Sequence, residues 1–566
     1  SREFRPIKIE GNDRHPASQG GTDVYAQASL LDMCDPDRSQ NVLYLGDIST
    51  WSTMVGALQG PLSAQKSLGG AGIRVLSRNF SSPTLTDQMQ QFQKAYPQAK
   101  WHFYEPVNRD DVYEGARMAF GQPVETTYDL SKADVIVSLD ADFLSAGFAG
   151  TTRYARDFAR RRDPDSEKMS RLYVIESTPS ATGAKADHRL PMKAGSVENF
   201  ARALAKHGYV GSLSVQTVFP DLSQAFSPEE HAFAVPVVRE LDGHKGASVV
   251  IAGDHQPPAV HALAHAMNAA LGNVGKTVFY SDPVLASTSN NNDSLKQLVG
   301  DMRAGKVDLL VILGGNPVYD APADFGFADA LKNTNIPIRV HLGLHQDETA
   351  ELCHWHVNEA HYLEAWGDAK AYDGSVCIVQ PLIAPLYNGK SALEVTAFLA
   401  GQSQANGYEV VQNYWKAKHS GTDFDMWWRK SVEQGFVDGT ASQPKQVSAK
   451  SGNSASTSSA PAQGEIEINF RRDPSIYDGQ FANNGWLQEL PKPMSKMTWD
   501  NPLLMSPRMA EQMKIASKDM VRVEINGKSL DLPVWIQAGH PDNSVTIFLG
   551  YGRRMAGRVG NEVGFD

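Results

Sequence analysis

Short apolar runs that end at Gly, Asp or Glu recur along this chain, and stretches of helical composition follow them. The clearest runs are residues 42–45, 135–139, 172–175, 249–252 and 309–313. Apolar runs of four or five residues that end in this way are typical of strands buried on both faces of a parallel sheet. The pattern therefore predicts a doubly wound α/β architecture.

The residues that follow these runs are candidate binding positions. Ligands of doubly wound sheets lie beyond the carboxyl ends of the strands, where loops and helix N-termini offer backbone N–H groups. The five strand ends begin at Gly46, Asp140, Glu176, Gly253 and Gly314. None carries a complete GxGxxG, so the sequence does not indicate a simple NAD site. Taken alone, the last of them favours a tight turn over a nucleotide contact.

Both ends of the chain show the alternation of β-structure. Residues 521–525 and 530–534 flank Asn526-Gly527, a pair that favours the primed turn of a hairpin, and a further strand is predicted over 545–549. Residues 6–10 alternate before a Gly-Asn turn, which predicts a short hairpin ahead of the first helix.

Length and composition place the chain among ordinary globular proteins. A chain of 566 residues is too long to fold around a single hydrophobic core, so three or four domains are expected. The formal charge of −11 gives no general affinity for nucleic acid or anionic lipid. No stretch approaches 18 consecutive apolar residues, so no direct membrane span is expected. Residues 445–463, rich in Ser and Ala, predict a flexible surface loop.

The cysteines are few and far apart. Cys34, Cys353 and Cys377 cannot supply the four thiolates of a [4Fe–4S] cluster, so the chain is expected to carry no cluster of its own. The scarcity fits a cytosolic protein or an exported one without disulfides. The sequence begins at Ser1 without a basic and apolar leader, so we expect any targeting signal to have been removed or to lie outside it.

Residues 341–381 gather five histidines and two tryptophans. They are His341, His345, His354, His356 and His361, with Trp355 and Trp366. Zinc sites use two His one helical turn apart with a third ligand, so a zinc hydrolase is one alternative. HExxH is missing, however, and histidines on a strand-to-loop path need no metal. The favoured interpretation is a wall segment that packs its tryptophans and hydrogen-bonds its imidazoles internally.

Several motifs resemble those of a known family. Glu348-Thr349-Ala350-Glu351 corresponds to E-T-A-E in the passage D-x-x-x-T-E-T-A-x-x-A-D-V-x-L-P of the molybdopterin oxidoreductase (DMSO-reductase-like) family, although residues 353–358 depart from A-D-V-x-L-P. Residues 186–191, ADHRLP, match its A-D-x-x-L-P. Over its whole length the chain most resembles the large molybdopterin-like, iron–sulfur subunit of bacterial alternative complex III. Residues 470–499 carry the most specific match, and their aromatics are expected to pack onto a neighbouring domain or subunit.

The resemblance implies a fold and a division into domains. It implies two doubly wound, Rossmann-like α/β domains, one of them discontinuous, and a C-terminal double-psi β-barrel. The implied units are 1–40 (remnant of a cluster domain), 41–80 with 245–400 (discontinuous domain), 81–244 (inserted domain), 401–470 (helical and flexible linker) and 471–566 (barrel). In that branch a ferredoxin-like domain with iron–sulfur clusters follows, so we expect either a truncated chain or a separately encoded half.

In this family a pterin dinucleotide lies between the two α/β domains. The corresponding, vestigial pocket would be formed by Gly46, Asp47, Asp140, Asp142, Glu176, Ser177, Thr178, Gly314, Gly315, Asn316, Glu348, Thr349, Gly550 and Arg553. A pyrophosphate needs Arg, Gly and backbone donors. Asp140, Asp142 and Glu176 place carboxylates at these strand ends, and carboxylates would repel the phosphates.

Two other departures from the family point the same way. Residues 22–25, Thr-Asp-Val-Tyr, replace the cysteine that ligates the family's N-terminal cluster. The segment that corresponds to the metal-ligand loop, residues 101–111, contains neither Ser nor Cys and leaves only Asp110 or Asp111. We therefore expect no molybdenum cofactor, no metal ligand and no catalytic residue in this chain.

The resemblance also implies a function. The chain would be a scaffold, itself not catalytic, in a quinol-oxidising respiratory electron-transfer complex. Its partners would be haem c and membrane quinol-binding subunits at the periplasmic face of the bacterial inner membrane. The alternative is an active molybdopterin-dependent oxidoreductase that holds molybdopterin guanine dinucleotide with an unusual metal ligand.

Overall fold

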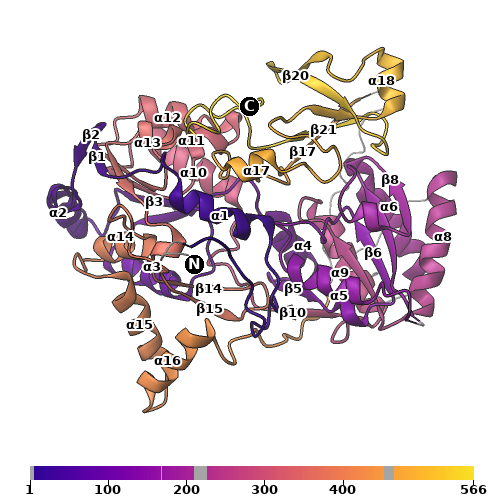
Figure 1. Ribbon diagram of the computed structural model, residues 1–566, viewed down its shortest axis with the longest axis horizontal. Helices are drawn as coiled ribbons and strands as arrows, with labels where there is room; N and C mark the ends of the chain where they lie inside the picture. Colours follow the sequence, from indigo (N-terminus) through magenta and orange to yellow (C-terminus); the bar gives the residue numbers. More distant parts are fainter. Residues whose placement is uncertain (1–5, 167, 210–225, 451–464) are drawn as a thin grey trace.

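The structure is a computed structural model that describes residues 6–166, 168–209, 226–450 and 465–566. Two α/β units lie side by side, and the C-terminal segment, in yellow, lies along the top of the molecule (Figure 1). Each unit is a sheet with helices on its faces, so the predicted α/β class is confirmed.

The first unit is built on a seven-stranded sheet with the order β2-β1-β13-β12-β11-β3-β4. Its strands are β1 (Val42–Tyr44), β2 (Asp47–Ser49), β3 (Ile73–Ser77), β4 (Lys100–Phe103), β11 (Leu309–Leu313), β12 (Ile338–Gly343) and β13 (Trp355–Asn358). The last five of the order are parallel, whereas β1 and β2 add an antiparallel edge.

Helices cover both faces of this sheet. One face packs against α2 (Trp51–Ser67), α3 (Pro83–Ala95) and α14 (Ala392–Leu399), and the other against α10 (Asn291–Arg303) and α12 (Phe327–Asn333). In β11, Leu309 and Val311 belong to the first core, whereas Leu310 and Ile312 belong to the second. Successive residues of a strand point to opposite faces, so a continuous apolar run is what a strand between two helical layers requires.

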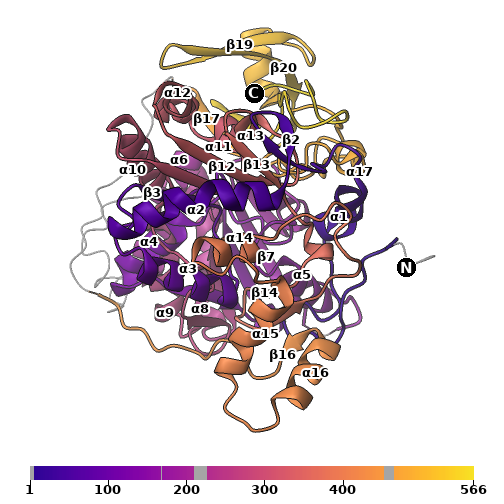
Figure 2. The ribbon, with the colours of Figure 1, turned by 90° about the vertical axis from the view of Figure 1, so that its left-hand side faces the viewer.

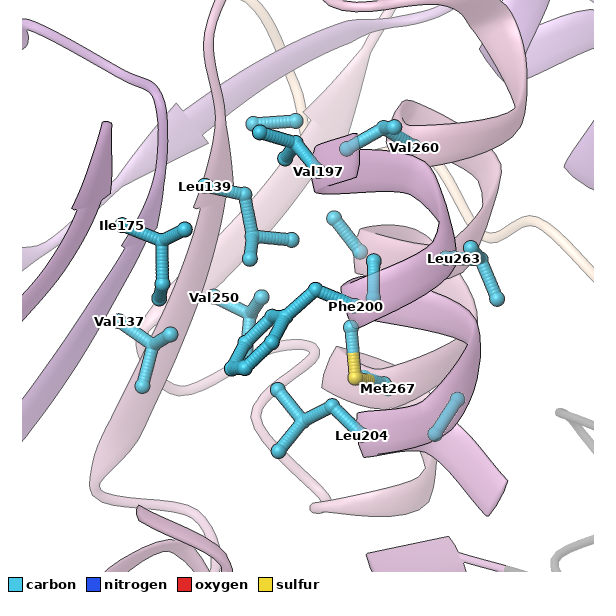
Figure 3. Packing of buried hydrophobic residues seen from close by; sticks show 14 of the residues in the cluster. Val137, Leu139, Ile175, Val197, Phe200, Leu204, Val250, Val260, Leu263 and Met267 are labelled. Atoms are coloured by element: carbon cyan, nitrogen blue, oxygen red, sulfur yellow. The ribbon is translucent and has the colours of Figure 1, made fainter. Parts of the chain in front are cut away.

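The second unit is built on a four-stranded parallel sheet with the order β8-β7-β6-β9. Its strands are β6 (Val135–Leu139), β7 (Arg171–Glu176), β8 (His188–Pro191) and β9 (Ser248–Ala252). One face packs against α6 (Ala194–Tyr209), α8 (Pro228–Gly243) and α9 (Pro258–Ala270), and the other against α5 (Thr151–Arg160) and the ribbon of β5 (Glu125–Tyr128) and β10 (Val278–Ser281). Figure 3 shows Phe200 and Leu204 of α6 against Val137, Leu139 and Val250 of the sheet.

The domain boundaries predicted from the sequence do not coincide with these sheets at two places. β4 lies in the range expected for the inserted domain but pairs with β3 of the first sheet. β9 lies in the range expected for the discontinuous domain but pairs with β6 of the second sheet. Parallel strands buried on both faces have similar apolar patterns, and the pattern alone does not say which sheet a strand joins.

The segment before the first sheet departs from the predicted hairpin. Residues 6–10 form no strand, so that prediction is wrong. The carbonyl of Ile9 accepts a hydrogen bond from the side chain of Gln27 at 2.7 Å and makes no strand pairing. The predicted helix is present as α1 (Val24–Cys34), and the Asp23 carboxylate caps it by accepting from the Ala26 N–H at 2.8 Å.

A smaller unit follows the first sheet. It contains the strands β14 (Gly367–Lys370), β15 (Val376–Val379) and β16 (Phe436–Val437) with the helices α15 (Gly407–Lys418) and α16 (Phe424–Gln434). Trp366, Trp415 and Trp428 pack in its core. Most of the predicted flexible loop over 445–463 lies outside the described residues.

The C-terminal segment forms a five-stranded mixed sheet with the order β17-β21-β18-β20-β19. Its strands are β17 (Glu467–Arg471), β18 (Leu503–Met505), β19 (Met520–Ile525), β20 (Lys528–Ile536) and β21 (Ser544–Phe548). The predicted hairpin is confirmed: β19 pairs with β20, and Asn526 and Gly527 have φ values of 50° and 78°, as a primed turn requires. Hydrogen bonds among the described residues close no barrel, so the double-psi prediction is not confirmed.

The remaining helices used below are short. They are α4 (Asp110–Phe120), α11 (Pro317–Asp320), α13 (Glu348–Glu351), α17 (Gly485–Glu489) and α18 (Pro507–Met513). Across the ranges that the structure describes, no helix combines the length and apolar character that crossing a bilayer needs.

The core in Figure 3 gives a first prediction. Phe200 is 1% exposed among Val250, Met267 and Val137. Replacing a large buried aromatic by Ala removes transfer energy and leaves a cavity, so Phe200→Ala should destabilise the second unit by about 3–5 kcal/mol. Urea unfolding followed by circular dichroism measures this change. Phe470, which is 55% exposed, is the matched control, and its Ala variant should stay within about 0.5 kcal/mol of the wild type; equal effects of the two substitutions would contradict the assignment of this core.

Candidate functional site

A cavity of about 390 Å³ lies where the second sheet meets the C-terminal segment. Its walls come from the ends of β6, β7 and β9, the N-termini of α4 and α10, and the end of β17. Its polar lining residues are Asn108, Asp111, Asp140, Asp142, Ser145, Thr178, Ser180, Asp254, His255, Asn292, Arg471, Arg472, Lys492, Ser495 and Gln537. The ends of three parallel strands thus open into one space, as expected for a doubly wound sheet.

Asp140 is the most heavily bonded side chain in this wall. It follows β6 directly, with a left-handed φ of 59° that Asp tolerates better than most residues. Its carboxylate accepts from the backbone N–H and hydroxyl of Ser177 at 3.0 and 2.8 Å, and from Gln256 at 2.8 Å. It also bonds His255 at 2.9 Å and Arg471 at 2.7 Å. Burial alone would raise the pKa of this carboxyl, but Arg471 and His255 hold it well below its usual range.

The other two strand-end carboxylates also have internal partners. Asp142 accepts from the backbone N–H and hydroxyl of Thr182 at 2.9 and 2.7 Å. Glu176 is 2% exposed and pairs with the guanidinium of Arg189. Burial raises the pKa of Glu176, and Arg189 opposes that shift. Each carboxylate therefore holds its own loop together, and Asp142 lines the cavity whereas Glu176 is not among its lining residues.

Ser177 and Thr178 join the strand end to the C-terminal sheet. The hydroxyl of Ser177 bonds both Asp140 and Arg471. The hydroxyl of Thr178 bonds that of Thr546 in β21 at 2.5 Å. These side chains fix the distance between the two units at the cavity.

The cations of the cavity are already engaged. Arg471 bonds Asp140, and Lys492 lies 3.3 Å from Asp473 and donates to the hydroxyl of Tyr551 at 2.6 Å. Arg472 donates to the Gly147 carbonyl at 2.7 Å.

The predicted residues at the end of the first sheet form a second cluster, outside this cavity. Asn316 donates to Glu348 at 2.6 Å, and its side-chain oxygen accepts from the Thr349 hydroxyl at 2.7 Å. Glu348 pairs with Arg553 at 2.8 Å and accepts from the backbone N–H groups of residues 554 and 555, both at 2.9 Å. Burial opposes ionisation of Glu348, but Arg553 lowers its pKa to about 2.

Glycines allow the C-terminal segment to approach this cluster. Gly550 has a φ of 98°, and a Cβ on it would lie 2.5 Å from the backbone nitrogen of Gly479. Gly314 and Gly315 have φ values of 68° and 77° and form the tight turn that the sequence favoured. Tyr319, just after this turn, donates to the Tyr551 carbonyl at 2.7 Å. The end of the first sheet is therefore covered by the protein's own chain.

Gly46 and Asp47 belong neither to the cavity nor to this second cluster. β1 runs antiparallel to β13, and Tyr44 pairs with Trp355 at the beginning of that strand. The turn after β1 therefore lies at the amino ends of the parallel strands, opposite to the ends that carry Gly314 and Glu348, and the prediction for these two residues is wrong. An apolar run does not show whether a strand is parallel or antiparallel to its neighbours, and the prediction took β1 to be parallel.

The segment that corresponds to the metal-ligand loop brings one carboxylate to the cavity. Asp110 begins α4 and accepts from the backbone and side-chain nitrogens of Asn291 at 2.7 and 2.6 Å. Asp111 lines the cavity, and burial, together with Asp110 and Glu114, raises its pKa to about 6. In the part of the chain that the structure describes, no group of three or more His, Cys, Asp or Glu side chains has a geometry that could hold a metal ion.

Two of the five histidines of residues 341–361 contact each other, and the other three bond separate partners. His341 and His356 stack and approach at 3.1 Å between their Nδ1 atoms. His345 bonds Asp35, His354 bonds the Arg339 backbone N–H, and His361 accepts from the Leu363 N–H. The described geometry favours the internally bonded wall over the zinc alternative.

Sequence reasoning missed part of this site. Arg471, Arg472 and Lys492 line the cavity from the C-terminal segment, and His255 lines it one residue after the predicted strand end at Gly253-Asp254. The pair of arginines directly after the apolar alternation of β17 was the available signal. Which cavity they enter depends on tertiary packing and could not be read from spacing.

Comparisons with known proteins agree with this fold. The chain is 24% identical over 461 residues to the molybdopterin-binding-like subunit of menaquinone reductase from Nitratidesulfovibrio vulgaris, a match that covers 74% of this chain and 65% of that relative's length. Its structure superposes on acetylene hydratase from Pelobacter acetylenicus with a TM-score of 0.73 and 12% sequence identity, covering 97% of this chain and 91% of that one. No model of a known protein family matches the sequence. The resemblance to the molybdopterin oxidoreductases is confirmed.

The donor set of the cavity can be compared with what the pterin dinucleotide of molybdopterin oxidoreductases needs. A pyrophosphate requires several cations and N–H groups that converge on it. Here Arg471 and Lys492 already pair with carboxylates, and Asp140 and Asp142 face the same space. Of these cations, Arg472 has no carboxylate partner among the described residues. The residues present do not fit a pyrophosphate in this arrangement.

The Glu348–Arg553 pair gives a second prediction. Glu348→Gln leaves Arg553 without its counter-charge, so we expect a loss of about 2–4 kcal/mol of stability at pH 7. The pKa of Glu348 is lower in the folded protein than its usual 4.5, so its stabilising contribution is present above pH 4.5 and is lost as the pH falls toward 2. The gap between wild type and variant should therefore narrow between pH 5 and pH 3 in urea unfolding curves. A gap that stays constant over this range would show that the ion pair does not cause it.

Proposed function

We propose that this chain is a scaffold subunit of a quinone-linked membrane respiratory complex of the alternative complex III type and that it holds neither a molybdenum cofactor nor an iron–sulfur cluster. The named relative is a molybdopterin-binding-like subunit of a menaquinone reductase, which supports a quinone-related respiratory role. In this role the chain positions electron-carrying subunits and is not itself catalytic.

The observation that carries the proposal is the network around Asp140. At the strand end where a phosphate would need donors, five hydrogen bonds from four side chains and one backbone N–H already converge on a carboxylate. A phosphate brought there would have to displace Arg471 from Asp140 and leave a buried carboxylate unpaired, which costs several kcal/mol. The network supports a cavity that stays without a pterin dinucleotide.

The cluster site supports the same proposal. Asp23 caps α1, and Tyr25 stacks on Phe481 with ring centroids 5.0 Å apart. These residues occupy the segment in which the family has its cluster cysteine, and they form ordinary helix and aromatic contacts. We propose that the partners are haem c and quinol-binding membrane subunits and that the assembly lies at the periplasmic face of the inner membrane.

Asp111 favours a second candidate function. Its carboxylate reaches the cavity from the segment that corresponds to the family's metal-ligand loop. Aspartate is one of the protein ligands that the resemblance allows for molybdenum or tungsten. An active enzyme with Asp111 as its metal ligand is therefore the alternative.

One experiment separates the two functions and gives a third prediction. The protein, purified with its complex from native membranes, should contain no molybdenum or tungsten by plasma mass spectrometry, and oxidation of the isolated chain should release no fluorescent pterin. The chain should remain with haem- and quinone-binding subunits through the purification. Molybdenum or tungsten above half-stoichiometric amounts, lost in Asp111→Ala but kept in Asp110→Asn, would overturn the scaffold proposal in favour of the enzyme.

A further inference from the structure

An apolar groove of about 490 Å³ lies on the other side of the loop after β6 from the cavity described above: Leu144 and Ala146 line the groove, whereas Ser145 lines the cavity. Its walls are α1, α5, α17 and the loop after β6. α1 and α17 pack against each other although they are more than 450 residues apart in the chain, and they lie side by side in both views (Figures 1 and 2). Grooves between helices with apolar walls are a common seat for a segment of another polypeptide.

Trp486 is the main exposed side chain of this groove. It is 53% exposed, and Leu490, one turn later, is 36% exposed. No described residue accepts a hydrogen bond from the Trp486 indole N–H, and Val24 and Ala155 line the groove together with it. Tryptophan supplies a large apolar area with a polar edge, and such residues are enriched at the centres of interfaces.

Two aromatic residues before Trp486 in the sequence pack against the N-terminal segment of the chain. Phe481 stacks on Tyr25 at 5.0 Å, and Tyr477 meets the same ring edge-on at 5.7 Å. Among the aromatics of residues 470–499, this inner pair therefore packs against the N-terminal segment, whereas Phe470, Trp486 and Trp499 are exposed. For Tyr477 and Phe481, the neighbour onto which these aromatics were predicted to pack is the N-terminal segment of the same chain.

The charge beside the groove indicates the chemistry of an occupant. Thr152 and Ala155 of α5 line the groove, and Arg156 and Arg160 continue the same face of the helix. Both arginines are exposed, and neither has a carboxylate partner among the described residues. The one acid of α5, Asp157, is 1% exposed and pairs with Arg153.

This basic end stands out in a chain whose formal charge is −11. Arg156 also donates to the Gln19 carbonyl, and the one carboxylate of the groove lining, that of Asp23, is engaged in capping α1 through the Ala26 N–H. An apolar groove with a basic end is complementary to a segment that has an apolar side followed by acidic residues. A basic segment would be repelled at this end, and a lipid chain would leave the arginines without partners.

We propose that the groove between α1, α5 and α17 is a docking site for an acidic, amphipathic segment of another protein subunit. One large apolar side chain of the segment packs against Trp486 and Leu490, and its carboxylates pair with Arg156 and Arg160. The proposal takes the existence of a complex from the proposed function but depends on no cofactor.

The test uses the full chain in native membranes. The photo-crosslinking residue p-benzoylphenylalanine is introduced in place of Trp486 or of Ala155. As a control it is introduced in place of Met426 of α16, which is 70% exposed. Both groove positions should crosslink to one segment of another subunit that contains at least two Asp or Glu residues close to the attachment point, as mapped by mass spectrometry. The control position should not crosslink to that segment.

Charge variants then test the pairing. Arg156→Glu with Arg160→Glu should lower the crosslink yield about tenfold, because two attractive contacts become repulsive, whereas Arg156→Lys with Arg160→Lys should keep most of it. The circular dichroism spectrum of the purified variants checks that they fold.

Four results would overturn the proposal: crosslinking to lipid, to a second copy of this chain or to a segment without acids, or a yield that charge reversal leaves unchanged. The absence of a crosslink at both groove positions would also overturn it. If the chain still purifies with its haem- and quinone-binding partners in that case, the docking site fails while the scaffold function stands. If the crosslink is instead to an acidic segment of a protein outside any respiratory complex, the docking site stands and the scaffold function fails.

Discussion

The ion pair between Asp140 and Arg471 connects two parts of the chain that are 331 residues apart. Asp140 directly follows β6 in the second sheet, and Arg471 ends β17 in the C-terminal sheet. Ser177, at the end of β7, bonds both of them, so three strand ends meet at one buried carboxylate. In a region of low dielectric constant neither charge is tolerable alone, which makes each sheet depend on the other for its position.

The same kind of contact recurs along the boundary between the α/β units and the C-terminal segment. Arg78, after β3, pairs with Asp478 at 2.7 Å and with Asp320 at 3.3 Å. Glu348 pairs with Arg553 across the same boundary. Ion pairs between the chain's own side chains therefore join the α/β units to the C-terminal segment at three places.

The sequence predicted individual strands and turns better than it predicted which distant segments pair with one another. The strands at 135–139 and 309–313 and the turn at Asn526-Gly527 followed from apolar runs and a turn dipeptide, because burial on both faces and positive φ values leave a direct mark on residue types. The sheet to which β9 belongs and the antiparallel direction of β1 left no such mark, since both depend on contacts between distant segments. The acidic strand ends were located correctly. Their partners, Arg189 and Arg471, could not be named, because the pairing of Asp140 is decided by how the C-terminal sheet docks.

A double-mutant cycle on Asp140 and Arg471 tests the central claim most directly. Asp140→Asn, Arg471→Gln and the double variant would be compared with the wild type by urea unfolding at pH 7. If the pair holds the two sheets together, the losses caused by the single substitutions should not add, and the coupling energy should be about 1–3 kcal/mol. A coupling energy indistinguishable from zero would show that the two charges are satisfied independently and would contradict the account.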